Sequence, residues 1–141
     1  MKAGIQRIAS EVGEAGCYAL CIMELAERIT GKSIDVLKAF IDGVHAKCIY
    51  YNFDNPEDPD NSTVTDAGRF LTLLTGKKYS HRYESDRKKP LKTGELIVER
   101  WERKATGKTY GHFVLPDWDP LGNSLTLKMG YWVSNRIFTP V

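Results

Sequence analysis

Apolar residues in the first half of the chain follow the spacing of helices, most clearly over residues 17–29. The polar residues Glu24, Glu27 and Arg28 lie three or four positions apart and therefore share one face. The rest of the circumference is apolar, which is typical of a helix that is buried on most sides. The pattern predicts a helix that begins at residue 17 and ends before Gly31, where a glycine favours termination.

Two more helices are expected before the middle of the chain. The second would have Ser33 as its N-cap and end near Gly43, and the third would have Thr65 as its N-cap and end at Gly76. Each presents one apolar face, formed by Ile34, Leu37, Ile41 and Val44 in the second and by Ala67, Phe70, Leu71 and Leu74 in the third. Between them, residues 45–53 form a β-branched and aromatic run that favours an extended conformation, and residues 54–62 form an acidic, proline-broken loop.

From Tyr79 onward the hydrophobic period changes to two, which indicates strands. Strands are expected over residues 96–101 and 109–115, joined by a turn at 105–108, and over residues 125–129 and 131–138, separated at Gly130. Helices therefore come first and an antiparallel sheet follows, which predicts the α+β class.

The composition narrows the function classes. The 141 residues suit a single domain over residues 1–141, and a hydrophobic content of 42% is that of a soluble globular protein. A net charge of +2 argues against a dedicated nucleic-acid binder, and no stretch is long enough to predict a membrane span. Three cysteines without disulfide spacing favour a reducing, cytoplasmic location.

The candidate chemistry rests on a cysteine and a distant histidine. A helix that began at Cys17 would place its thiol near free backbone N–H groups and the positive end of the helix dipole, which favour a thiolate. His112 lies on a predicted strand and could take the thiol proton if the two side chains meet. Such a pair needs no cofactor and no metal.

A third group should orient the imidazole, and three residues downstream of His112 are candidates: Asp117, Asp119 and Asn123. If the chain reverses at Leu115-Pro116, Asp119 lies directly opposite His112 in a short hairpin. If it does not reverse there, an extended chain would carry Asp119 about 23 Å away, at roughly 3.3 Å per residue. Asp117 or Asn123 would then be preferred.

Two blocks of the sequence resemble papain-like cysteine peptidases. They are Gly16-Cys17-Tyr18 at the head of the apolar helix and Gly111-His112-Phe113-Val114, followed by Asp119-Pro120. The similarity extends over roughly residues 11–29 and 110–138. Within that superfamily the chain is most similar to bacteriocin-leader-processing (double-glycine) peptidase domains and to small uncharacterised phage-type members.

The resemblance implies a papain-like fold, with an N-terminal helical half packed on a C-terminal antiparallel sheet and a substrate cleft between them. It implies a cysteine peptidase or amidohydrolase that cleaves a peptide or amide bond. Cys17 would be the nucleophile, His112 the general base and Asp119 the orienting group, with the Cys17 backbone N–H stabilising the oxyanion. It also implies a phage or mobile-element setting.

Three near-site positions depart from the family pattern. Glu11 stands where the family usually has a glutamine that helps bind the oxyanion, and Glu14 offers no better donor. Tyr18 stands where the peptidases usually have glycine. These departures support an alternative, a catalytically inactive papain-like binding module. A zinc site drawn from the three cysteines and three histidines is a weaker alternative, because no Cys-x-x-Cys or close histidine pair exists.

Overall fold

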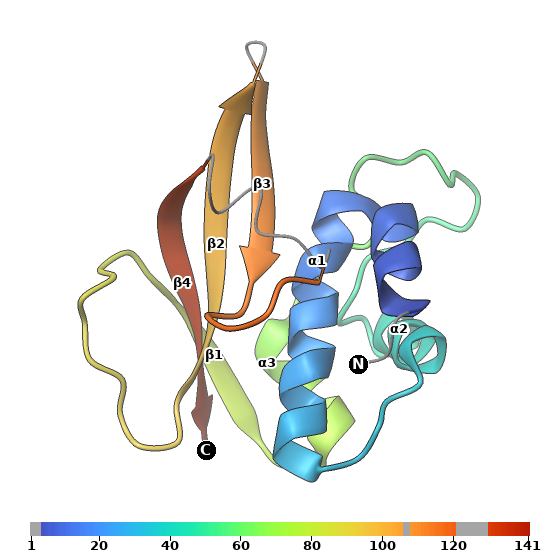
Figure 1. Ribbon diagram of the computed structural model, residues 1–141. Helices are drawn as coiled ribbons and strands as arrows, with labels where there is room; N and C mark the ends of the chain where they lie inside the picture. Colours follow the sequence, from blue (N-terminus) through green and yellow to red (C-terminus); the bar gives the residue numbers. More distant parts are fainter. Residues whose placement is uncertain (1–3, 106–107, 121–129) are drawn as a thin grey trace.

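The computed structural model describes residues 4–105, 108–120 and 130–141, with side chains described over residues 16–102, 111–120 and 130–141. Three helices precede four strands along the chain (Figure 1). The helices are α1 (Gly4–Thr30), α2 (Val36–His45) and α3 (Ala67–Thr75), and the strands are β1 (Tyr79–Glu84), β2 (Leu96–Ala105), β3 (Lys108–Val114) and β4 (Tyr131–Pro140). The expected α+β class, with helices first, is confirmed.

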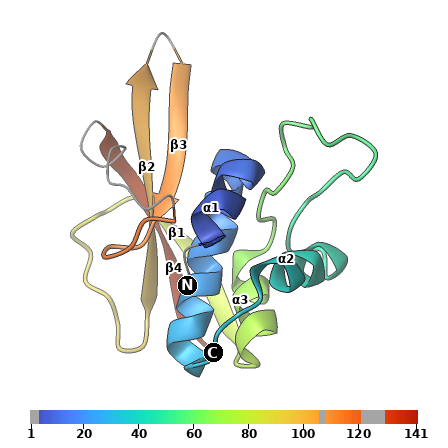
Figure 2. The ribbon, with the colours of Figure 1, turned by 45° about the vertical axis from the view of Figure 1, so that its right-hand side comes forward.

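The four strands form one antiparallel sheet in the order β1-β4-β2-β3, so β3 lies at an edge. Both views of the ribbon place the three helices on one side of this sheet (Figures 1 and 2). Helix α1 contacts both β3 and α3 and therefore links the sheet to the other helices. Its buried side chains join those of the sheet in one core, which includes Leu20, Ile22, Phe70, Val98 and Phe138.

The expectation that Cys17 begins a helix was wrong, because α1 begins at Gly4. Gly13 and Gly16 precede the cysteine, but the other residues of this stretch are mostly adequate helix formers. The glycines do not end the helix. Instead, α1 bends sharply in its first half (Figure 1), and glycine is a common cause of such bends.

The ends of the helices agree better with the sequence than their beginnings. Gly31 and Gly76 follow α1 and α3 with positive φ angles of 69° and 71°, as expected of terminating glycines. The N-caps, in contrast, are Asp35 for α2 and Asp66 for α3, not Ser33 and Thr65. Each aspartate accepts a hydrogen bond from the backbone N–H three residues later, which is the usual role of an N-cap residue.

The strands differ from expectation mainly in length. Strand β2 runs on to Ala105, and β4 extends from Tyr131 to Pro140. Residues 45–53 do not form a regular strand, and only Ile49 makes an isolated bridge, to Val64. The strand expected over residues 125–129 lies outside the described residues.

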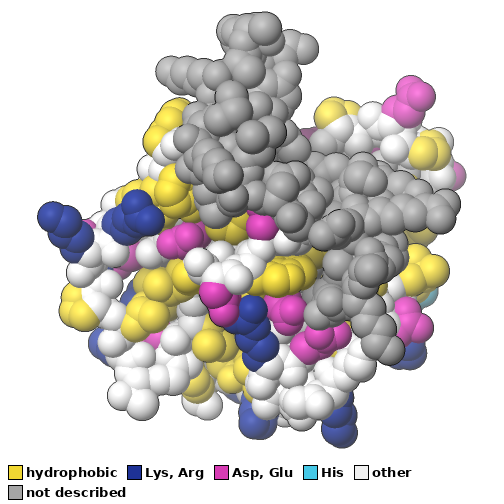
Figure 3. Space-filling view, in the orientation of Figure 1, with side chains coloured by type: hydrophobic (Ala, Val, Ile, Leu, Met, Phe, Trp, Pro, Cys, Tyr) yellow, Lys and Arg dark blue, Asp and Glu magenta, His cyan; other side chains and the backbone are white. Residues whose placement is uncertain are grey.

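No helix in the described part of the chain is long and apolar enough to cross a membrane. On the face drawn in Figure 3, the coloured Lys and Arg side chains stand among Asp, Glu and hydrophobic side chains and do not gather into one basic patch.

Candidate active site

His112 and Asp119 form a buried pair at the β3 edge of the sheet. The distance from His112 Nε2 to Asp119 Oδ1 is 2.8 Å, and the two side chains are only 5% and 9% exposed. A carboxylate at this distance holds the imidazole in one orientation and favours the tautomer with the proton on Nε2. The contact expected between these two residues is therefore present.

The hairpin that delivers Asp119 has a different register from the one expected. Leu115 bridges Trp118, and the Leu115 N–H donates to the Trp118 carbonyl over 2.8 Å. Pro116 and Asp117 therefore form the turn, and Asp119 is not directly opposite His112. Its side chain nevertheless reaches the imidazole across the short hairpin.

The other two candidates for orienting His112 have different positions. Asp117 points away and accepts two hydrogen bonds from Arg28 Nη1 on α1, at 2.9 and 3.2 Å. Asn123 lies outside the described residues. The ion pair between Arg28 and Asp117 fastens the hairpin to α1, a link that the sequence analysis missed because the two residues are far apart in the chain.

Helix α1 lies along β3, and the two run in the same direction (Figure 1). Cys21 Sγ donates to the Phe113 carbonyl over 3.4 Å, and Arg28 is level with Asp117. Cys17 precedes Cys21 by one helical turn, which is roughly 6 Å along the helix axis. The same length of a strand contains about two residues, at roughly 3.3 Å each. Because Cys21 lies beside Phe113 and the two elements run in the same direction, Cys17 lies at the height of residues 111–112 along the strand.

The two cysteines that face β3 are enclosed. Cys17 is 1% exposed and Cys21 is fully buried. Burial raises the pKa of the Cys21 thiol well above its ordinary value, and the neighbouring Cys17 and Asp119 raise it further. Asp119 is thus close enough to α1 to act on a cysteine there, as well as on His112.

The structure describes the three near-site residues, Glu11, Glu14 and Tyr18, to different extents. Glu11 and Glu14 lie within α1, but their side chains are outside the described part of the chain. Tyr18 is buried, and its ring stacks on Phe113 with the centroids 4.4 Å apart. Because α1 begins at Gly4, the free N–H groups of a helix start do not lie at Cys17, and the expected oxyanion donor loses its basis.

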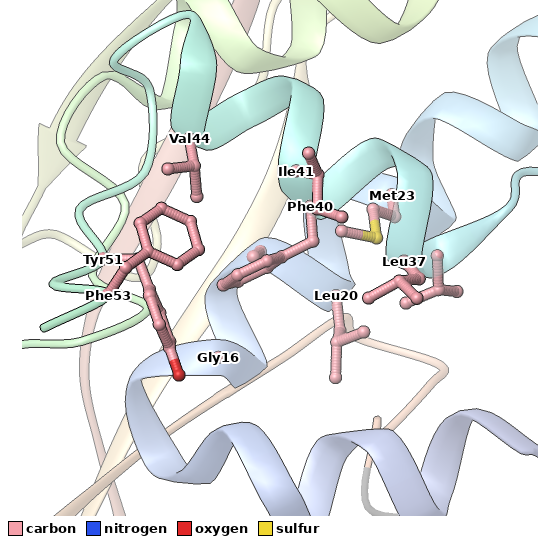
Figure 4. Close-up of a pocket in the computed structure, with 11 residues that line it drawn as sticks. Gly16, Leu20, Met23, Leu37, Phe40, Ile41, Val44, Tyr51 and Phe53 are labelled. Carbon is pink, nitrogen blue, oxygen red and sulfur yellow. The ribbon is translucent and has the colours of Figure 1, made fainter. Parts of the chain in front are cut away.

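An apolar pocket of about 510 Å³ opens between α1 and α2, on the side of α1 that Gly16, Leu20 and Met23 present. Phe40 and Ile41 of α2 face it, with Tyr51 and Phe53 at one end (Figure 4). No candidate catalytic residue lines it among the described residues. Within the described residues, no group of three metal-ligating side chains comes together either.

Comparisons with known proteins found no match for this chain. No protein-family model matches the chain, and no match was found among curated proteins or among solved structures.

Proposed function

We propose that the protein is a papain-like cysteine hydrolase that cleaves a peptide or amide bond. The observation that carries the proposal is the buried contact of 2.8 Å between His112 Nε2 and Asp119 Oδ1, on a strand that α1 covers. Cys17 is level with this pair by the register of Cys21 on Phe113. The order of nucleophile, base and orienting carboxylate along the chain also suits this class.

The chemistry follows from the two ring nitrogens. Asp119 accepts from Nε2, which leaves the Nδ1 lone pair to take the proton of the Cys17 thiol. The thiolate then attacks the carbonyl carbon, and the protonated imidazole gives its proton to the departing amine. His112 then takes a proton from water, and the hydroxide attacks the thioester carbon. The C–S bond breaks, the carboxylic acid leaves, and the imidazolium of His112 returns its proton to the Cys17 thiolate.

A second candidate is a non-catalytic binding module with the same fold. The burial of Cys17, at 1% exposed, favours it, because a nucleophile must be reached by its substrate. The two candidates differ in whether an acyl group is ever transferred to Cys17.

The test uses p-nitrophenyl esters of N-acetylated amino acids, whose good leaving group reduces the demand for exact substrate fit. We expect a burst of p-nitrophenol, together with an acyl mass on the peptide that contains Cys17. Cys17→Ala and His112→Ala should both abolish the burst, and Cys48→Ser should leave it unchanged. Acylation at Cys48 alone, or a burst that survives Cys17→Ala, would favour the binding module.

A further inference from the structure

Two arginines lie close together on the helix-covered face of the sheet. Arg100 of β2 pairs with Phe113 of β3, and Arg136 of β4 pairs with Val98 of β2. Both guanidinium groups lie over the Phe113 ring, with Cζ 5.1 Å (Arg100) and 5.6 Å (Arg136) from its centroid. Arg136 also lies 4.6 Å from the Tyr83 ring.

Among the side chains that the structure describes, the carboxylates around this pair do not balance its charge. The only ion pair that either arginine makes among the described residues is Arg100 Nη2 to Glu102 Oε1, at 3.5 Å, which is long for a charge-assisted hydrogen bond. Arg136 makes no ion pair within the described residues and donates only to Ser134 Oγ, at 2.6 Å. Burial and the neighbouring Arg100 lower the pKa of Arg136. A half-buried cation that no described carboxylate neutralises favours a negatively charged ligand, because burial of an unpaired charge is costly.

A buried hydroxyl group lies near Arg136. Tyr18 stacks on the same Phe113 ring, is only 8% exposed, and its hydroxyl has no hydrogen-bond partner among the described residues. Burial raises the pKa of this hydroxyl, and the nearby Arg136 charge partly opposes the rise. The O–H therefore stays protonated and is available as a donor, and a buried donor without a partner costs roughly 1–3 kcal/mol.

Gly111 provides the space that Arg100 occupies. A Cβ atom at this position would collide with the Arg100 guanidinium, so only glycine lets the arginine lie across β3 in its present position. Gly111 and Phe113 present the same face of the sheet to the arginines, whereas the side chain of His112 between them points to the opposite face.

We propose that Arg100, Arg136 and the Tyr18 hydroxyl form a binding site for the carboxylate of a small acid or peptide ligand, on the opposite face of the sheet from the His112 side chain. Arginine binds carboxylates through two parallel N–H donors, and the tyrosine hydroxyl supplies a third.

The test is a titration with N-acetylglycine, with N-acetylglycinamide and inorganic phosphate as comparison ligands, followed by NMR of the arginine Nε–H groups. We expect N-acetylglycine to shift the Arg100 and Arg136 signals and the neutral amide to leave them in place. Arg136→Gln should weaken binding about ten- to hundredfold, the usual worth of a charged hydrogen bond. The exposed Arg69→Gln is the matched control.

Two further variants keep the test valid if Arg136→Gln does not fold. Tyr18→Phe and Gly111→Ala alter the site without removing an arginine, and both should weaken binding of N-acetylglycine. Equal shifts with acid and amide, or wild-type affinity in all these variants, would overturn the site. Phosphate binding more tightly than the acid at the same signals would overturn its assignment to a carboxylate.

The titration does not require a reactive cysteine. Carboxylate binding without acylation of Cys17 by the esters would leave the site standing and remove the hydrolase. Acylation of Cys17 by the esters without carboxylate binding would support the hydrolase and overturn the carboxylate site.

Discussion

His112 depends on a single carboxylate, Asp119, for its orientation in the candidate site. Asp119→Asn keeps the shape of the side chain but removes the charge that stabilises an imidazolium, and it can present a donor to Nε2 in place of an acceptor. We expect the rate of Cys17 acylation by p-nitrophenyl esters to fall by at least about tenfold. Asp117→Asn, which loses only the exposed pair with Arg28, is the matched control and should keep most of the rate.

The Tyr18 hydroxyl allows a prediction about stability at the same scale. Tyr18→Phe removes a buried donor that has no partner within the described residues, so the free energy of unfolding should rise by about 1 kcal/mol. Tyr50→Phe removes a hydroxyl that donates to Asp58 over 2.7 Å and should give no such gain. Urea unfolding at pH 7 measures both, and a Tyr18→Phe variant less stable than wild type would contradict the prediction.

Individual residues of the site were only partly predictable. Asp119 could be chosen because a hairpin near Pro116 was the one local arrangement that returned a carboxylate to His112. Arg100 and Arg136 could not, because they meet through the strand order β1-β4-β2-β3, which brings β4 between two earlier strands. Such a pairing leaves no trace in local hydrophobic spacing.

At the scale of elements, α2 packs against α3 at Gly43, which has no side chain. A Cβ atom on Gly43 would lie 2.8 Å from Ile49 Cδ1 and 2.8 Å from Phe70 Cε1, and both of these side chains are buried. Gly43→Ala should lower the free energy of unfolding by about 1–2 kcal/mol, because overpacking outweighs the gain in helix propensity. Leu37→Ala on the exposed face of α2 should change it less. A Gly43→Ala variant that is more stable than wild type would contradict this prediction, because it would show that α2 can move away from Ile49 and Phe70 at little cost.

Glu95 joins β1 and β4 to the segment before β2. It accepts hydrogen bonds from Arg82 and Thr139 and from the Lys92 N–H, and these contacts lower its pKa to about 2. Because the folded-state pKa lies below the ordinary value, this stabilisation is present above about pH 4.5 and is lost as the pH falls toward 2.

Glu95→Gln should therefore be less stable than wild type at pH 7, and the difference should shrink between pH 4.5 and pH 2. Urea unfolding at several pH values measures it, with the exposed Glu57→Gln as the control. A difference that stays constant over this range would mean that the charge of Glu95 does not contribute.

The elements themselves were largely predictable because periodicity is a local property. The ends of α1 and α3 followed from Gly31 and Gly76. The start of α1 did not follow, because a glycine inside a helix costs only about 1 kcal/mol and packing of the helix can offset that cost. Gly13 and Gly16 could not show that the helix continues through them.

At the scale of the whole molecule, α1 lies along β3 and contributes residues to both proposed sites. Cys17 and Cys21 face the strand, Tyr18 covers Phe113, and Arg28 fastens the hairpin that carries Asp119. The helix therefore positions both the candidate nucleophile and the carboxylate site. The overall α+β plan was predictable from the order of periods along the chain, whereas this placement of α1 required the tertiary structure.

The most direct test of the central claim is the pH dependence of iodoacetamide alkylation at Cys17, measured by peptide mass spectrometry. An ordinary thiol loses reactivity about tenfold per pH unit below roughly pH 8.5. Cys21 and Cys48, whose pKa values are raised by burial, serve as internal controls. If Cys17 and His112 form a thiolate–imidazolium pair, Cys17 should react rapidly at pH 6 in the wild type and lose this reactivity in His112→Ala. If Cys17 titrates like an ordinary thiol, or stays unreactive at every pH, the hydrolase proposal is contradicted.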